Sequence, residues 1–292
     1  MATSHAPGSV TCDRAGVAPA RAVTPLVLSL FPGVDLLGRG FEHEGFCVVR
    51  GPDKLWAGDI FDFHPPAAAF DGIIGGPPCQ EFSSKRRKPT TGIGLELLKQ
   101  FGRVVLEAEP EWWLVENVDR VPDLRVPGYS VQRFDLNARE CGMPQSRRRH
   151  FQFGSREGLV LVPERSKPSG PIARIALASE GRSARRRGWA EFCGLQGLPP
   201  LELPGMSIAA RYQAVGNGVP IPMARVVARA IRERRVRAVD VRLCKCGCGR
   251  IVSGRQEMAT AACRKRMERR RKRDPAPTAA SRLVTCDPAP TL

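Results

Sequence analysis

A cysteine stands in a stiff, polar loop that follows an apolar segment of the chain. Cys79 lies in the run Gly-Gly-Pro-Pro-Cys-Gln-Glu-Phe-Ser-Ser, at the end of segment 71–76. The two prolines restrict the loop, and a thiolate held in such a loop is a strong nucleophile for covalent catalysis. The commoner fate of a lone cysteine is an inert place in the core. The polar residues that follow Cys79 favour the nucleophile.

An acid and two arginines stand at the ends of other apolar segments. Glu116 ends segment 112–117, where a buried carboxylate is costly unless it has a role, such as that of a general acid with a raised pKa. An ion-paired or helix-capping glutamate is an equally good interpretation in isolation. Arg147 and Arg149 precede segment 150–155, and in an extended backbone they would point to one face. Two guanidiniums on one face suit phosphate or base recognition; the alternative is a solvated basic edge.

Four cysteines lie close together near the C-terminus. Cys244, Cys246, Cys248 and Cys263 supply four thiols, enough for a tetrahedral zinc site. The run resembles small zinc-binding knuckles that end in a basic helix, here 264–273, although the spacing is not the usual pair of cysteines two residues apart. Reduced, unbound thiols, or a site that uses only three of them, are the alternatives.

Short apolar segments alternate with longer amphipathic ones along the chain. This alternation predicts an α/β fold with a doubly wound, mostly parallel sheet, and such sheets bind ligands at the carboxyl ends of their strands. Cys79 and Glu116 would both lie at that edge. The expected strands are 25–31, 47–50, 71–76, 112–117, 130–138 and 150–155, and the expected helices are 95–108 and 222–239.

The chain is strongly basic. Its 292 residues include 46 Lys and Arg against 29 Asp and Glu, a formal net charge of +17. Such an excess points to a polyanionic partner, usually nucleic acid. No apolar run approaches the ~20 residues that span a bilayer, and the N-terminus lacks the apolar core of a signal peptide. We therefore expect a cytoplasmic, monomeric protein with no membrane partner.

The order of four motifs resembles the DNA cytosine-5 methyltransferase family. Gly-Gly-Pro-Pro-Cys-Gln, Glu-Asn-Val, Gln-x-Arg-x-Arg and Gly-Asn-Gly-Val-Pro follow one another within roughly residues 26–232. The resemblance implies a Rossmann-like methyltransferase fold that moves a methyl group from S-adenosyl-L-methionine to C5 of a cytosine flipped out of double-stranded DNA. It implies that Cys79 adds to C6 of the base, that Glu116 contacts the cytosine, and that Arg147 and Arg149 lie near it.

The resemblance also implies a set of cofactor-binding residues. Phe31 and Gly33 correspond to the first cofactor loop, Asp59 meets the adenine edge, and Ile60 packs on the ring. The full set is Phe31, Gly33, Asp53, Asp59, Ile60, Pro77, Leu97 and Asn217.

The cofactor loop departs from the family pattern. Ser29 stands where an aspartate usually begins the loop, and Gly33-Val34-Asp35 replaces Gly-x-Gly. Arg50 stands where an acid for the ribose hydroxyls usually ends the second strand. Asp53 or Glu44 could substitute for that acid.

The motifs divide the chain into regions. Only about 156–188 remain for target recognition, which predicts a short or relaxed target sequence. The expected regions are a flexible leader (1–24), a catalytic domain (25–155 and 189–236), the reduced recognition region (156–188), a zinc-binding knuckle with a basic helix (243–273) and a disordered tail (274–292).

Two other functions remain open. A catalytically inactive DNA-binding protein of the same fold would explain the departures in the cofactor loop. An RNA cytosine-5 methyltransferase would share the basic surface, although the motifs resemble the DNA family more closely.

Overall fold

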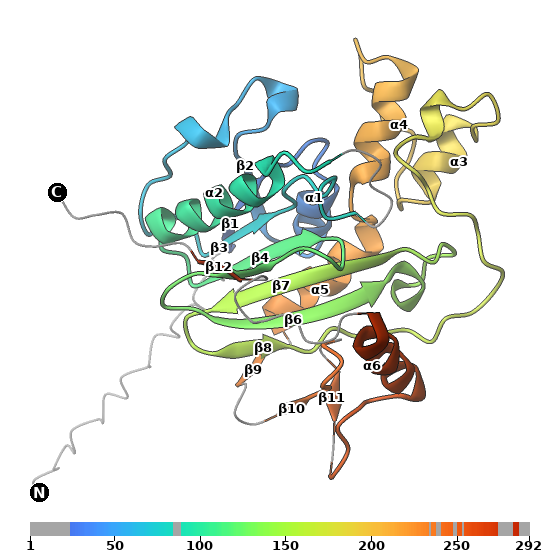
Figure 1. Cartoon of the computed structure of the whole chain (residues 1–292). Helices are drawn as coiled ribbons and strands as arrows, with labels where there is room; N and C mark the ends of the chain where they lie inside the picture. The colour runs from blue at the N-terminus through green and yellow to red at the C-terminus, as the bar shows by residue number, and fades with distance from the viewer. Residues whose placement is uncertain are drawn as a thin grey trace, which may run out of the picture.

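The computed structural model of the protein is built around a six-stranded sheet in the order β2-β1-β3-β4-β7-β6 (Figure 1). It describes residues 24–83, 89–233, 235–237, 241–247, 250–252, 254–273 and 283–285. The first four strands are parallel, and β7 runs antiparallel to both of its neighbours. The predicted fold class is thereby confirmed. The strands are β1 (Leu26–Leu30), β2 (Cys47–Arg50), β3 (Gly72–Gly75), β4 (Trp112–Asn117), β6 (Ser130–Asn137) and β7 (Arg148–Ser155).

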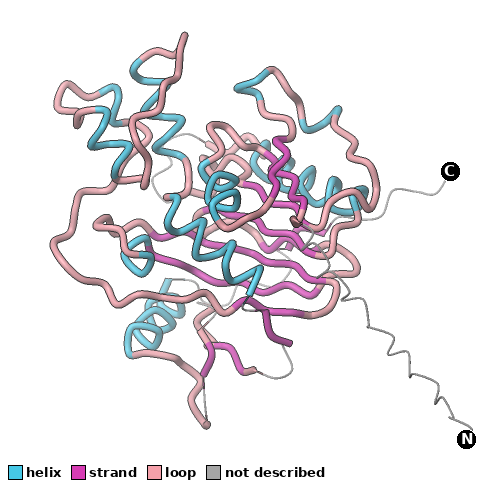
Figure 2. Tube along the Cα trace, turned by 180° about the vertical axis from the view of Figure 1, so that it is seen from behind, coloured by secondary structure: helices cyan, strands magenta, loops and turns pink. Residues whose placement is uncertain are grey.

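Helices cover both faces of this sheet (Figures 1 and 2). Helices α1 (Leu36–His43) and α5 (Ile221–Glu233) pack on one face, and α2 (Ile93–Ala108) packs on the other. Side chains alternate along a strand, so Trp112 faces α1 and α5 whereas Trp113 faces α2. Burial on both faces explains why the strands read as almost continuous apolar runs.

A smaller core lies between the loop from β8 (Leu159–Leu161) and the two helices that follow it. Helices α3 (Trp189–Gly194) and α4 (Ile208–Asn217) bring Phe192 and Tyr212 together, with ring centroids 4.5 Å apart. Figure 1 shows this lobe beside the edge at which β1, β3 and β4 end. The lobe thereby adds residues from late in the chain to that edge.

The expected helix 222–239 is shorter in the structure. Helix α5 ends at Glu233, and Arg235–Arg237 form β9, which pairs antiparallel with β8. The last buried side chain of the helix is Ile231, and Arg232 and Glu233 are exposed. Once the apolar stripe ends, further helical turns would gain no burial.

The C-terminal cysteines belong to a compact appendage, here called the Cys-rich unit (residues 241–247, 250–252 and 254–273). Strands β10 (Arg242–Leu243) and β11 (Ile251–Val252) form a small antiparallel pair, followed by α6 (Ala261–Arg273), which contains the basic run. Cys248 lies outside the described residues.

The chain ends fall mostly outside the described residues, including 1–23 of the expected leader. Within the segment expected to be a disordered tail, Leu283–Thr285 form β12, which pairs with β5 (Asp123–Arg125). Of the helices that the structure describes, none has the length and apolar character to cross a membrane.

Candidate active site

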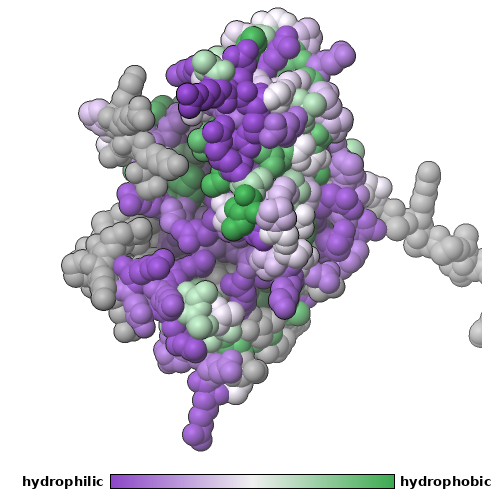
Figure 3. Space-filling model, turned by 90° about the vertical axis from the view of Figure 1, so that its right-hand side faces the viewer, coloured by the Kyte–Doolittle hydropathy of each residue, from purple (hydrophilic) through white to green (hydrophobic). Residues whose placement is uncertain are grey.

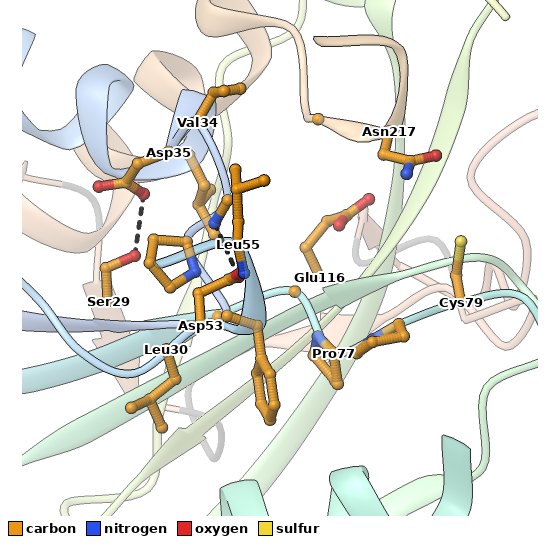
Figure 4. Close-up of a pocket in the computed structure, with 18 of the residues that line it drawn as sticks. Ser29, Leu30, Val34, Asp35, Asp53, Leu55, Pro77, Cys79, Glu116 and Asn217 are labelled. Atoms are coloured by element: carbon orange, nitrogen blue, oxygen red, sulfur yellow. Dashed lines mark hydrogen bonds between the residues drawn. The ribbon is translucent and has the colours of Figure 1, made fainter. Parts of the chain in front are cut away.

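A cavity of about 530 Å³ opens at the edge where β1, β3 and β4 end (Figure 4). Its walls come from the loops after these strands and β2, together with α2 and α4. Open α/β sheets bind their ligands at this edge. All eight predicted cofactor residues line the cavity, and so do Cys79, Glu116 and Arg149. These predicted residues are Phe31, Gly33, Asp53, Asp59, Ile60, Pro77, Leu97 and Asn217.

The three unusual positions of the cofactor loop contact one another. Ser29 Oγ donates a hydrogen bond to Asp35 Oδ1 (2.9 Å), and Arg50 Nε lies 3.0 Å from Asp35 Oδ2. Asp35 also caps α1, because its Oδ1 accepts from the Gly38 N–H at 3.0 Å. The pKa of Asp35 is raised by burial, against the opposing effects of Ser29 and Arg50. Arg50 at the end of β2 is therefore explained by its ion pair with this buried acid.

The two candidates for the ribose-binding acid lie in different places. Asp53 lines the cavity, where its Oδ2 accepts from the Gly33 N–H (2.9 Å) and its Oδ1 from the Leu55 N–H (2.7 Å) at the start of the short helix Lys54–Trp56. Glu44 follows α1 and pairs with Arg225 (2.7 Å) and Arg229 (2.9 Å) of α5. Of the two, Asp53 alone therefore lines the cavity.

The loop that carries Cys79 is held by the neighbouring strand end. Asn117 at the end of β4 is buried, and its Nδ2 donates to the Pro77 carbonyl oxygen at 2.9 Å. A side chain at Gly76 would crowd Glu116, since a Cβ there would lie 3.2 Å from Oε2. Burial raises the pKa of the Cys79 thiol, the charge of Glu116 raises it further, and Arg149 opposes both. Sequence analysis missed Asn117, although the Glu-Asn-Val motif contains it.

Glu116 points into the cavity beside Cys79 (Figure 4). Its Oε1 lies 2.8 Å from Arg149 Nε, and the residue is 7% exposed. Burial raises the pKa of Glu116, although Arg149 and Arg147 favour its charged form. A carboxyl group that holds its proton at higher pH than usual can donate a hydrogen bond to a substrate nitrogen.

Arg147 makes a different kind of contact from Arg149. It is 4% exposed, and it donates to the carbonyl oxygens of Ala176 (3.0 Å), Gly216 (2.7 Å) and Gly218 (3.0 Å). Burial and the charge of Arg149 lower its pKa to about 9, so the guanidinium remains charged at neutral pH. A cation at the end of α4 satisfies carbonyl groups that the helix leaves without partners. Arg147 therefore fastens the segment that carries Asn217.

Three cysteines of the C-terminal cluster meet in a second potential binding site. The Sγ atoms of Cys244, Cys246 and Cys263 lie within 4.8 Å of one another, and all three residues are buried. The Ala259 N–H donates to Cys244 Sγ, and the Thr260 hydroxyl donates to Cys263 Sγ, both at 3.2 Å. Such bonds stabilise thiolates, so the donor set fits a thiophilic ion such as Zn²⁺.

The sheet and its two helical layers have the Rossmann-like α/β fold of methyltransferases. The sheet is similar to that of a crystal structure described as a prophage-encoded DNA modification methyltransferase from E. coli, with a TM-score of 0.50 and 16% identity, over 72% of this chain and 99% of that one. Residues 53–177 match the family described as C-5 cytosine-specific DNA methylase. This match supports the resemblance seen in the motifs.

Curated relatives agree with this match. Type II methyltransferase M.HgiDI of Herpetosiphon aurantiacus is 32% identical over 165 residues, which cover 46% of this chain and 53% of the relative. Type II methyltransferase M.SacI of Streptomyces achromogenes is 29% identical over 214 residues, covering 64% and 52%. The chain spans about half the length of the curated relatives it matches.

Proposed function

We propose that the protein transfers a methyl group from S-adenosyl-L-methionine to C5 of a flipped-out cytosine in double-stranded DNA, through a covalent adduct with Cys79. The observation that carries this proposal is the shared cavity, which Cys79, Glu116 and Arg149 line together with the candidate cofactor residues. Relatives named Type II methyltransferases support the reaction class and a role in restriction–modification. The net charge of +17 supports a DNA partner.

The donor site would be the end of the cavity near β1. Ile60 and Phe31 offer apolar surface, Asp53 and Asp59 offer carboxylates for hydroxyl and amino groups, and Asn217 closes the site from α4. When bound there, S-adenosyl-L-methionine supplies an electrophilic methyl group.

At the end of the cavity that contains Cys79 and Glu116, the chemistry depends on the transfer of one proton. Before a substrate binds, the raised pKa keeps the proton on Cys79. When the sulfur adds to C6 of cytosine, this proton is transferred, by way of Glu116, to N3 of the ring. The electron pair of the C5–C6 double bond then becomes available at C5. There it would form the new bond to the methyl group, while the methyl–sulfur bond of the donor breaks and the donor leaves as a neutral thioether. Loss of the C5 proton to a base expels the Cys79 thiolate, and N3 returns its proton.

Glu116 and Arg149 would act on the ring rather than on the methyl group. A carboxyl group hydrogen-bonded to N3 stabilises the charge that develops during thiolate addition. Arg149, 2.8 Å from Glu116, fixes the orientation of that carboxyl. The flipped base costs a few kcal/mol of unstacking, which contacts with the DNA backbone offset.

The Cys-rich unit would carry a structural Zn²⁺ ion, held by Cys244, Cys246 and Cys263. Cys248, which lies outside the described residues, is the natural fourth ligand. We propose that this ion stabilises the folded Cys-rich unit and takes no part in methyl transfer.

Methyl transfer to duplex DNA tests the proposal. Wild-type protein should move label from S-adenosyl-L-methionine to cytosine C5, and Cys79→Ala should not. On a duplex with 5-fluorocytosine, wild type should form a stable covalent adduct, because fluorine replaces the proton whose loss releases the enzyme. Cys47→Ala, at an exposed cysteine outside the cavity, is the matched control.

The alternatives give different results. DNA binding without label transfer would identify a catalytically inactive DNA-binding protein. Label on RNA and none on DNA would identify an RNA cytosine methyltransferase. The small recognition region predicts that mapped methylation follows a short or relaxed sequence, and a long, strictly read site would contradict it.

A further inference from the structure

A second cavity, of about 240 Å³, lies where the Cys-rich unit meets the main sheet. Its walls come from the end of β6, from the short helix η3 (Ala138–Cys141), from the start of β7, and from the first turn of α6. Five arginines line it, but only two carboxylates, Asp135 and Glu140. The arginines are Arg139, Arg148, Arg165, Arg250 and Arg266.

The contacts of these arginines leave an excess of positive charge. Glu140 is shared by Arg165, at 2.9 Å, and Arg250. Arg139 donates to backbone carbonyl oxygens, among them those of Ser169 and Gly170 at 3.0 Å. One carboxylate therefore serves two guanidiniums, and the charge of Arg139 has neutral partners in these bonds.

The second carboxylate in the cavity, that of Asp135, contacts one basic side chain from α6 and another from β7. Asp135 accepts from Arg266 of α6 at 2.9 Å and lies 2.8 Å from His150 Nδ1 of β7. Burial opposes ionisation of Asp135, but the bond to His150 and the nearby arginines outweigh it and lower its pKa. Arg148 pairs with a third acid, Asp119, which does not line the cavity. Three acids thus accompany the five guanidiniums without neutralising all of them.

The cavity adjoins the catalytic edge of the sheet. In the antiparallel registers, Asn137 pairs with Arg148, Leu136 pairs with Arg149, and Asn117 pairs with His150. Arg148 in the cavity wall is thus the direct neighbour of Arg149, which pairs with Glu116. In Figure 1 the Cys-rich unit and the α3–α4 lobe lie on opposite sides of this edge.

The basic character continues from the cavity onto the surface. Arg264, Lys265 and Arg269 on α6 are exposed. Hydrophilic side chains cover much of the face seen in Figure 3, which looks onto the edge where β1, β3 and β4 end. A duplex held at the catalytic edge would therefore meet cations on its flank.

We infer that the five-arginine cavity binds a phosphate of the DNA backbone and so makes the Cys-rich unit one wall of the DNA-binding site. Guanidiniums bind phosphate oxygens in pairs, and such contacts position a duplex without reading its sequence. The inference rests on the proposed function. It also explains how an enzyme with a small recognition region gains affinity, since phosphate contacts supply most sequence-independent binding.

The test is the salt dependence of DNA binding by the full chain, measured by fluorescence anisotropy with a labelled duplex. Each lost phosphate contact reduces the slope of log K against log salt by about 0.9, which corresponds to about fivefold weaker binding near 0.15 M salt. Arg250→Gln and Arg148→Gln should each reduce the slope by about that amount. Melting temperatures of both variants show that the fold is kept.

Arg225→Gln is the matched control. Arg225 shares Glu44 with Arg229, just as Arg250 shares Glu140 with Arg165. The same charge is lost, but on α5, away from the second cavity, so the slope should equal that of wild type. A reduced slope in this control would show that net charge alone is responsible and would overturn the inference.

Two further results would also overturn it. The first is an unchanged slope in both Arg250→Gln and Arg148→Gln. The second is thermal stabilisation by inorganic phosphate that Arg250→Gln abolishes while DNA binding is unaltered, which would mark a site for a free anion. The methyl-transfer assay distinguishes failure of this inference from failure of the proposed function. If the wild type methylates DNA and both variants keep the full slope, the phosphate site is refuted and the proposed function is kept.

Discussion

The Nε atom of Arg149 lies 2.8 Å from Oε1 of Glu116, in the wall of the cavity that also contains Cys79. The two charges of this pair have opposite effects on the pKa of Cys79. Beyond the larger effect of burial, Glu116 raises the pKa of Cys79 and Arg149 lowers it. Because the thiolate is the reactive form, the rate at which Cys79 is alkylated reports its pKa.

Glu116→Gln should make Cys79 more reactive. The change removes a negative charge and leaves Arg149, so the pKa of Cys79 falls and the thiolate fraction at pH 8 rises. A fall of one pKa unit gives about tenfold faster alkylation below the pKa. The measurement is the rate of iodoacetamide labelling at Cys79, followed by mass spectrometry with exposed Cys47 as internal reference.

Arg149→Gln should have the opposite effect on the rate of Cys79 labelling. Removing the cation raises the pKa of Cys79, so labelling slows at the same pH. Slower labelling in Glu116→Gln, or faster labelling in Arg149→Gln, would refute the electrostatic coupling between these three groups.

Arg147→Lys and Arg149→Lys should separate stability from catalysis. Lysine keeps the charge of Arg147 but loses the planar fork of donors, so buried carbonyl groups such as that of Gly216 lose their partner. We expect Arg147→Lys to lower the free energy of unfolding by about 2–4 kcal/mol. Arg149→Lys keeps a cation beside Glu116, so it should cost less stability than Arg147→Lys yet reduce methyl transfer. Urea denaturation of both variants checks this, and equal losses of stability would contradict it.

Sequence analysis grouped these two arginines and could not distinguish their contacts. Alternation along an extended backbone placed Arg147 and Arg149 on one face. In the structure β7 begins at Arg148, and the Arg147 N–H donates to the Gln145 carbonyl oxygen in a turn. The Arg147 guanidinium donates to carbonyl groups at the end of α4, about 70 residues further along the chain, and no local pattern signals such a contact.

The strands and the catalytic edge could be predicted because they depend on local patterns. Apolar segments with polar residues at their ends predicted β1, β3 and β4, and the topology of parallel sheets then placed Cys79 and Glu116 together. Pairings between distant residues left no local signal. Asp35 with Arg50, and Arg266 with Asp135, depend on how whole elements pack.

Metal removal should destabilise the Cys-rich unit. Purified protein is expected to contain about one Zn²⁺ per chain, and Cys244→Ser or Cys263→Ser should lose it, because both residues belong to the buried thiol group. Chelation should lower the melting temperature of the unit by several degrees, about 2–4 °C for each kcal/mol lost. Cys47→Ser is the control that should keep the metal. Metal-free wild-type protein would exclude the site.

Asp53 and Glu44 form a matched pair for the cofactor site, since either could replace the usual ribose-binding acid in sequence. Asp53 lines the cavity and holds the Gly33 N–H, whereas Glu44 is paired with Arg225 and Arg229. Asp53→Asn should therefore weaken binding of S-adenosyl-L-methionine about tenfold or more, the loss of one charge-assisted hydrogen bond of ~1.5–3 kcal/mol. Glu44→Gln removes the same charge and should leave that affinity unchanged. The two arginines lower the pKa of Glu44 against the effect of burial, so its ionised form stabilises the fold at neutral pH. Glu44→Gln should therefore lower the stability of the protein at neutral pH. Isothermal titration with the cofactor and thermal melting of both variants measure the two effects. Equal cofactor affinity in wild type and Asp53→Asn would remove Asp53 from the site.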